Sequence, residues 1–381
     1  MSFLGFRTPS GGRIDRERPL RFTFDGRSYL GLQGDTLASA LLANGVHLVG
    51  RSFKYHRPRG ILAAGSEEPN ALVAVRRDDA RYTPNLRATQ VELYEGLEAR
   101  SQNRWPSLAL DIGAVSNLLS PFIPAGFYYK TFMWPRKAWR ALYEPCIRRA
   151  AGLGRAPSRP DPDRYANRFA HCDVLVVGAG PTGLAAALAA AQSGARVILC
   201  DEQSELGGSL LAGTRISARG ARPDEPKRRE HSEHSEQSKH SEQSGQYKSP
   251  ERSERIAGKP AGDWLVETLA ALERDPRVTL LPRTTAFGYF PHNFVALNQR
   301  LTDHLPAPSS REPRERQWQV RAREVVLAAG AIERPLVFPG NDRPGIMLAG
   351  AARTWLNRYG VLPGTRAVVV TACDAAYQAA L

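Results

Sequence analysis

Residues 172–208 read CDVLVVGAGPTGLAAALAAAQSGARVILCDEQSELGG. The apolar run at 174–177 predicts a buried strand, and a second run at 196–200 predicts another. Between them, an alanine- and leucine-rich run that ends at Gly194 predicts a helix. The stretch is therefore expected to form a strand–helix–strand unit of a Rossmann-like α/β domain.

The turn between the first strand and the helix carries the motif Gly178-x-Gly180-x-x-Gly183. Gly178 would permit the tight turn, Gly180 would let the backbone approach a pyrophosphate, and Gly183 would let the helix lie close to the strand. A lone GxGxxG is weak, but here it follows a strand, opens a helix and is followed after 23 residues by Asp201. The context predicts an adenine dinucleotide site, with a Rossmann unit that binds no ligand as the alternative.

An acid at the end of the second strand accepts hydrogen bonds from the adenosine ribose and repels a 2′-phosphate. Asp201 is followed by Glu202 rather than by arginine, so NAD or FAD is favoured over NADP. The candidate cofactor-binding residues are Gly178, Ala179, Gly180, Pro181, Thr182, Gly183, Asp201, Glu202, Gly207, Gly208 and Gly330.

Residues 1–100 predict a small α+β domain of the β-grasp type. The expected elements are a hairpin at 20–33 turning at Asp25-Gly26, a helix capped by Asp35 and stopped by Gly45, and strands at 71–75 and 88–94.

Residues 101–170 are rich in proline and read as a linker. Half of the net charge of +14 falls within 130–168, where ten basic residues meet three acids and aromatic residues interleave. Such a stretch fits single-stranded nucleic acid or the surface of another subunit. Because no nucleic-acid motif accompanies it, we favour contact with a partner protein.

The dinucleotide-binding domain is expected over 171–381. A low-complexity insertion at 214–258, with repeats of HSE and few apolar residues, predicts disorder. The further predicted elements are an amphipathic helix at 262–276, a strand with its continuation at 278–290, strands at 317–321 and 324–327, a turn at Gly330 and a buried strand at 366–371.

Composition narrows the class of protein. Four cysteines without a CxxC pair argue against a disulfide scaffold, a zinc site or a dithiol redox centre. No secretory signal or membrane-length apolar run is seen, so we expect a cytoplasmic protein without a membrane partner. No catalytic residue stands out, and a structural role is favoured for each of the histidines His56, His171, His292 and His304.

Taken together, the chain resembles the α subunit of heterotetrameric sarcosine oxidase. The segments that carry the resemblance are GDTLASALLANGV (34–46), RSFKYHRPRG (51–60), the glycine-rich unit at 173–211, LAAGAIERPLVFPGNDRPGIML (327–348) and TWLNRYGVLPG (354–364).

The resemblance implies an oxidoreductase subunit, inactive alone, of a complex that demethylates sarcosine to glycine and formaldehyde and forms hydrogen peroxide. It implies NAD in this chain, FMN at the interface with the β subunit, FAD within the β subunit, and γ and δ subunits that complete the assembly. It also implies a fold with a ferredoxin-like first domain before the Rossmann-like domain.

Two departures from related sequences bear on these expectations. No cysteine occurs in residues 1–145, and because a [2Fe–2S] cluster needs about four thiolate or imidazole ligands, the first domain is expected to be cluster-free. The chain also ends soon after the strand expected at 366–371. This reads as a truncated subunit with an incomplete second α/β unit and no folate-binding domain.

Two other functions remain open. One is a non-catalytic scaffold in which a structural NAD stabilises the interface with a partner. The other is a standalone flavin-dependent oxidoreductase, although the absence of CxxC argues against the disulfide-reducing type.

Overall fold

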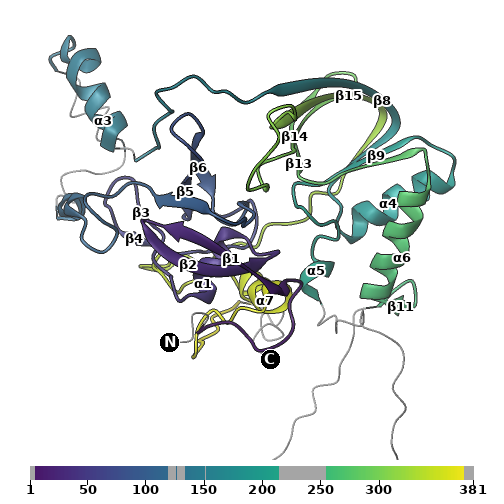
Figure 1. Cartoon of the computed structure of the whole chain (residues 1–381), viewed down its shortest axis with the longest axis horizontal. Coiled ribbons are helices and arrows are strands. Elements are labelled where there is room, and N and C mark those ends of the chain that lie inside the picture. Colours follow the sequence, from purple (N-terminus) through teal and green to yellow (C-terminus); the bar gives the residue numbers. More distant parts are fainter. Residues whose placement is uncertain (1–4, 119–125, 127–133, 151, 214–254, 373–381) are drawn as a thin grey trace, which may run out of the picture.

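The computed structural model describes residues 5–118, 126, 134–150, 152–213 and 255–372. Figure 1 shows two sheet-centred parts, the first built on a five-stranded sheet and the second on a six-stranded sheet. Most of the insertion predicted at 214–258, and the end of the chain from residue 373, lie outside the described residues. Within the described part, no helix has the length and apolar character needed to cross a membrane.

The first sheet has the strand order β2-β1-β7-β5-β6. Strands β1 and β2 form an antiparallel hairpin, β7 runs parallel to β1, and β5 is antiparallel to β7 and β6. Two short strands pair beside the sheet. The bounds are β1 Asp15–Phe24, β2 Arg27–Gln33, β3 Gly50–Arg51, β4 Pro58–Arg59, β5 Leu72–Arg76, β6 Tyr82–Arg87 and β7 Leu97–Ser101.

The hairpin turn forms where the sequence places it. Asp25 has φ 50° and Gly26 has φ 78°, the left-handed conformations that a two-residue primed turn requires. The predicted hairpin is confirmed. Aspartate and glycine suit this turn because they tolerate a left-handed backbone better than most residues.

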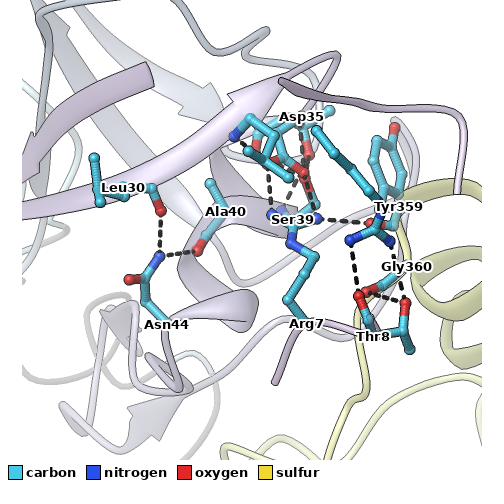
Figure 2. Close-up of polar contacts among 12 residues, drawn as sticks. Arg7, Thr8, Leu30, Asp35, Ser39, Ala40, Asn44, Tyr359 and Gly360 are labelled. Carbon is cyan, nitrogen blue, oxygen red and sulfur yellow. Dashed lines mark hydrogen bonds and ion pairs between the residues drawn. The ribbon is translucent and has the colours of Figure 1, made fainter. Parts of the chain in front are cut away.

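The helix expected after residue 35 is α1 (Leu37–Ala43), and its side chains are all buried. Its N-cap is Thr36 and not Asp35, so that prediction was wrong. The Thr36 hydroxyl accepts from the Ser39 amide at 3.2 Å. Asp35 instead accepts from the Arg7 guanidinium at 2.6 Å and from the Ser39 hydroxyl at 2.7 Å, as Figure 2 shows. The buried Arg7 side chain thus binds the Asp35 carboxylate, and the Thr36 hydroxyl, a weaker acceptor, caps the helix.

The strand predicted at 88–94 was also wrong. These residues form a turn and an extended connection between β6 and β7. The Ala88 amide donates to the Ala71 carbonyl at 2.9 Å. Leu93 and Tyr94 are buried against the first sheet, so these apolar residues belong to the core without forming a strand.

Residues 102–164 connect the two parts, and the described residues among them form short helices. These are a 3-10 helix at Ile112–Asn117, a π-helical turn at Trp139–Tyr143 and α3 (Glu144–Ala150). Trp134 is 83% exposed and Trp105 is 66% exposed, so aromatic surface faces solvent here. A partner-binding role for this segment stays a prediction.

The second sheet has the order β12-β9-β8-β15-β14-β13. Its first four strands are parallel, and β14 and β13 follow as antiparallel strands. The bounds are β8 Tyr165–Val177, β9 Val197–Cys200, β12 Val278–Leu281, β13 Thr284–Phe290, β14 Phe294–Arg300 and β15 Glu315–Leu327. Strand β8 begins earlier than its apolar core at 174–177, because its polar first half pairs along β15.

Two helices cover one face of this sheet beside each other (Figure 1). Helix α4 (Pro181–Gln192) connects β8 to the strand after it. Helix α6 (Ala261–Arg274) is the predicted amphipathic helix, and its buried residues include Trp264, Leu265 and Leu272, at helical spacing on one side. The short α5 (Leu210–Gly213) and the pair β10 (Arg255–Ile256) and β11 (Lys259–Pro260) complete this part.

Three strand predictions in this part need correction. Residues 278–290 form two strands at opposite edges of the sheet, and since only residues 282–283 join them, the sheet must curl until its edges approach. Residues 317–321 and 324–327 belong to the single strand β15, because pairing with β8 in one register continues through Ala322 to Glu324. Residues 366–371 form no strand among the described residues, and Val368 there is 91% exposed.

After the second sheet, the chain returns to the first part. Helix α7 (Ala349–Tyr359) places Trp355, Tyr359 and the following Val361 in the same core as the first sheet. The Arg7 guanidinium donates to the Tyr359 carbonyl at 2.6 Å as well as to Asp35 (Figure 2). The first domain is therefore completed by residues far along the chain.

This return predicts that Trp355→Ala unfolds the first domain at lower denaturant concentration. Trp355 is completely buried, and truncating a buried tryptophan to alanine costs about 3–5 kcal/mol. Urea unfolding followed by circular dichroism measures the loss. The matched control is Trp134→Ala, because Trp134 is 83% exposed and its truncation should leave the midpoint unchanged. Equal midpoints for the two variants would contradict the assignment of α7 to this core.

Candidate functional site

The glycine-rich loop lies at the carboxyl end of β8, where α4 begins. The Gly178 amide donates to the Cys200 carbonyl at 2.8 Å, and the Ala328 amide donates to the Val177 carbonyl at 2.8 Å. The ends of β8, β9 and β15 thus meet at one place. Open parallel sheets bind ligands at this edge.

Gly178 and Gly183 are needed for close backbone packing. A Cβ on Gly178, whose φ is +99°, would lie 2.3 Å from the Ala328 carbonyl oxygen. A Cβ on Gly183 would lie 1.8 Å from the Gly178 carbonyl oxygen. A side chain at either position would push α4 away from the sheet, so both residues shape the loop.

Gly180 has a different role, because a Cβ there would meet nothing within 4 Å. It is the N-cap of α4 and is followed by Pro181 in the first turn, with Thr182 exposed. The first amides of a helix have no partner within the helix and carry a partial positive charge. The open space over Gly180 thus faces a surface suited to a phosphate.

Gly207 and Gly208 lie against the same loop. The Gly207 amide donates to the Ala179 carbonyl at 2.9 Å, and a Cβ on Gly208 would lie 2.7 Å from the Gly180 Cα. Both have positive φ, 145° and 55°. Gly207 and Gly208 therefore form a wall beside Gly180 that consists of backbone atoms alone.

Asp201 directly follows β9 and is turned towards the loop. Its carboxylate accepts from the Ala179 amide at 2.7 Å and from the Gln203 amide at 2.9 Å. Ala179 itself is fully buried, so its amide and not its side chain takes part. An ionised carboxylate has about four acceptor positions, which leaves Asp201 capacity for hydroxyl donors.

Glu202 is turned towards the first domain. Its carboxylate accepts from the Gln90 side chain at 3.3 Å, and the Arg300 guanidinium donates to its main-chain carbonyl at 2.9 Å. Burial raises the pKa of Glu202, although a hydrogen bond from Ser66 acts in the opposite direction. Glu202 therefore lies next to the loop without forming its wall.

The segment 201–208 is held from outside by residues that the sequence analysis missed. The Arg13 guanidinium pairs with the Glu205 carboxylate, and the Arg358 guanidinium donates to the Gln203 side chain. These contacts join the first domain and α7 to the edge of the site. No local pattern signals them, since each depends on tertiary packing.

Gly330 lies two residues beyond Ala328, whose carbonyl touches Gly178. Its φ is +75°, and a Cβ there would meet nothing within 4 Å. The structure thus places the residues before Gly330 at the loop, while Gly330 itself remains open to solvent or ligand.

Thiol chemistry is disfavoured at this site. Burial raises the pKa of Cys200 to about 12 and that of Cys172 to about 11, so both thiols stay protonated at neutral pH. No group of three or more potential metal ligands gathers among the described residues. The arrangement offers helix amides and bare backbone, which suit a pyrophosphate, and a carboxylate, which suits ribose hydroxyls.

Family models match both parts of the chain. Residues 17–104 match the 2Fe-2S iron-sulfur cluster binding domain, and residues 173–289 match FAD dependent oxidoreductases. The solved structure of L-proline dehydrogenase from P. horikoshii matches 94% of this chain and 50% of that chain, with a TM-score of 0.54 at 17% identity. The predicted fold, a ferredoxin-like domain followed by a Rossmann-like domain, is confirmed.

Curated relatives extend over nearly the whole chain. Sarcosine oxidase subunit alpha of Rhizobium meliloti (strain 1021) is 55% identical over 98% of this chain and 34% of its own length. The subunit of the same name from Corynebacterium sp. (strain P-1) is 38% identical over 96% of this chain and 29% of its own length. The chain thus spans about a third of the relatives it matches.

The loop geometry predicts that Gly183→Ala destabilises the second domain. The new Cβ would lie 1.8 Å from a backbone oxygen, and the backbone must shift to admit it, at a cost of about 1–3 kcal/mol. Thermal unfolding of the purified chain measures it. Gly364→Ala is the control, since its Cβ would have only an ordinary contact at 3.7 Å. An unchanged midpoint for Gly183→Ala would contradict the tight packing described here.

Proposed function

We propose that this chain, a homologue of the sarcosine oxidase α subunit along nearly its whole length, binds an adenine dinucleotide within a multi-subunit sarcosine oxidase. The identities confirm the resemblance drawn from the sequence motifs. The observation that supports dinucleotide binding is the open space over Gly180, bordered by the helix start, Gly208 and the Asp201 carboxylate.

The proposed reaction is the oxidative demethylation of sarcosine. Sarcosine, oxygen and water give glycine, formaldehyde and hydrogen peroxide, so two electrons and two protons pass from the amine to oxygen. A bound nicotinamide or flavin supplies an acceptor for such electrons. The amides at the start of α4 would hold the pyrophosphate of the dinucleotide, and the Asp201 carboxylate would hold its ribose.

We propose NAD as the occupant. FAD is the second candidate for the same loop, because residues 173–289 match the model of FAD dependent oxidoreductases. In that case, the chain would itself be a flavin-dependent oxidoreductase. The proposal also places FMN at an interface with a β subunit, FAD in that subunit, and γ and δ subunits beside them. It further includes a cytoplasmic location.

The first domain is proposed to be free of an iron–sulfur cluster. It matches a cluster-binding family in fold, but residues 1–145 contain no cysteine to supply thiolate ligands. The domain would then serve to hold the segment 201–208 through Arg13 and Gln90.

The decisive experiment identifies the small molecule that the purified chain releases on denaturation, by mass spectrometry. NAD supports the proposal, and FAD together with flavin absorbance supports the standalone flavoenzyme. Adding the β subunit then tests the complex, because sarcosine-dependent peroxide formation should appear only with both chains. The scaffold function would be favoured if the chain binds the dinucleotide and the reconstituted complex is equally active after the dinucleotide is removed.

Gly180→Ala should weaken dinucleotide binding while the fold remains. The Cβ meets no protein atom, so it would occupy the space of the phosphate, and we expect at least a tenfold loss, equivalent to about 1.4 kcal/mol. Loss of a glycine N-cap adds a cost of about 1 kcal/mol or less to stability. Calorimetric titration with NAD⁺ measures affinity, and Gly364→Ala serves as control. Unchanged affinity for Gly180→Ala would refute this binding site.

The chain should also prefer NAD⁺ to NADP⁺ by at least tenfold, equivalent to about 1.4 kcal/mol. The Asp201 carboxylate lies at the end of β9, and a 2′-phosphate there would meet like charge. Competition titrations of the two nucleotides give the ratio. Equal affinities would mean that the ribose lies away from Asp201.

A further inference from the structure

A cavity of about 170 Å³ lies between the two domains, and its lining residues do not include the glycine-rich loop at 178–183. Its walls come from β5, β6 and the 88–94 connection on one side and from the ends of β13, β14 and β15 on the other. Five arginines, one histidine and two acids line it: Arg77, Arg81, Arg87, Arg300, Arg314, His304, Glu92 and Asp303. Of the two acids, Glu92 pairs with Arg283 at 2.7 Å and Asp303 pairs with Arg314.

Two of these arginines are compensated by acids. Arg81 pairs with Asp78 and Asp163, each at 2.6 Å. Arg314 pairs with Asp303 at 2.7 Å and with Asp163 at 3.4 Å. Their charges are therefore balanced within the wall.

The other three have only neutral acceptors among the described residues. Arg77 donates to the carbonyls of Thr302, Asp303 and Leu305, at 3.2, 2.7 and 2.8 Å. Arg300 donates to the carbonyls of Gln90 and Glu202, at 3.0 and 2.9 Å. Arg87 donates to the Glu68 carbonyl at 3.2 Å. Three guanidinium charges thus face one interdomain space without a partner carboxylate in the described structure.

These carbonyl bonds fix the arginines without using up their donors. A guanidinium has five N–H groups, of which Arg77 uses three, Arg300 two and Arg87 one in the contacts above. Arg77 also lies over the Tyr94 ring, 4.7 Å from its centroid. Several directed donors therefore remain, on side chains already held in place.

We propose that this cavity binds a small oxyanion, either inorganic phosphate or the carboxylate or phosphate group of a small metabolite. Planar guanidinium groups match the geometry of such anions, and charge-assisted hydrogen bonds to them are roughly twice as strong as neutral ones. A bound anion would link Arg77 and Arg87 of the first domain to Arg300 of the second. Binding would therefore stabilise the contact between the domains.

The test is calorimetric titration of the full chain with inorganic phosphate and, separately, with acetate, at constant ionic strength set with chloride. Constant ionic strength removes general screening, which otherwise acts on every surface charge. Saturable binding of either anion is the expected result, with a rise in the thermal unfolding midpoint. No saturable heat with either anion in the wild-type chain would overturn the proposal.

Arg87→Gln is the informative variant, because Arg87 is exposed and makes a single bond, so its loss should leave the fold intact. We expect its anion affinity to fall about tenfold, the effect of losing one charge-assisted hydrogen bond. Arg77→Gln should weaken binding further. Arg100→Gln is the matched control, since Arg100 pairs only with Glu98 in the described structure, outside the cavity.

Wild-type affinity in Arg87→Gln would show that the arginines only join the domains, and would overturn the site. NAD⁺ titration of the same variants reports on the glycine-rich loop independently. Loss of anion binding with NAD⁺ binding retained separates this cavity from the dinucleotide site.

Discussion

The second domain depends on backbone approaching backbone at one place. Gly178 and Gly183 bring the start of α4, the end of β8 and Ala328 so close that a Cβ on Gly183 would lie 1.8 Å from a carbonyl oxygen. Because no side chain fits between these segments, the first amides of α4 lie at the carboxyl edge of the sheet. The same closeness leaves Gly180 facing open space, so the packing constraint and the binding surface arise from one turn.

The first domain and α7 contact the segment beside that turn through polar and charged side chains. Arg13, Gln90 and Arg358 contact the segment 201–208 from three separate parts of the chain. Exposed ion pairs contribute little to the free energy of unfolding. Arg13 and Glu205 are partly buried, and their contact matters more for the position of the segment 201–208 than for stability. The ferredoxin-like domain thus contacts the Rossmann-like unit beside its glycine-rich loop.

Much of this arrangement could be predicted from the residues alone. Glycine spacing and apolar runs signalled the turn, α4 and β9, and Asp25-Gly26 signalled the hairpin, because each depends on local conformation. Asp35 was assigned to the wrong role because Arg7, 28 residues away, competes for its carboxylate. Strand edges in the curled sheet and the anchoring of the segment 201–208 depend on distant partners, which periodicity does not report.

The return of α7 has a consequence for synthesis. The core of the first sheet lacks Trp355 and Val361 until the ribosome has passed them. At about 5–20 residues per second, the interval between residue 104 and residue 361 lasts roughly 13–50 s. During that time, the apolar surface that Trp355 and Val361 cover in the folded chain stays open to solvent.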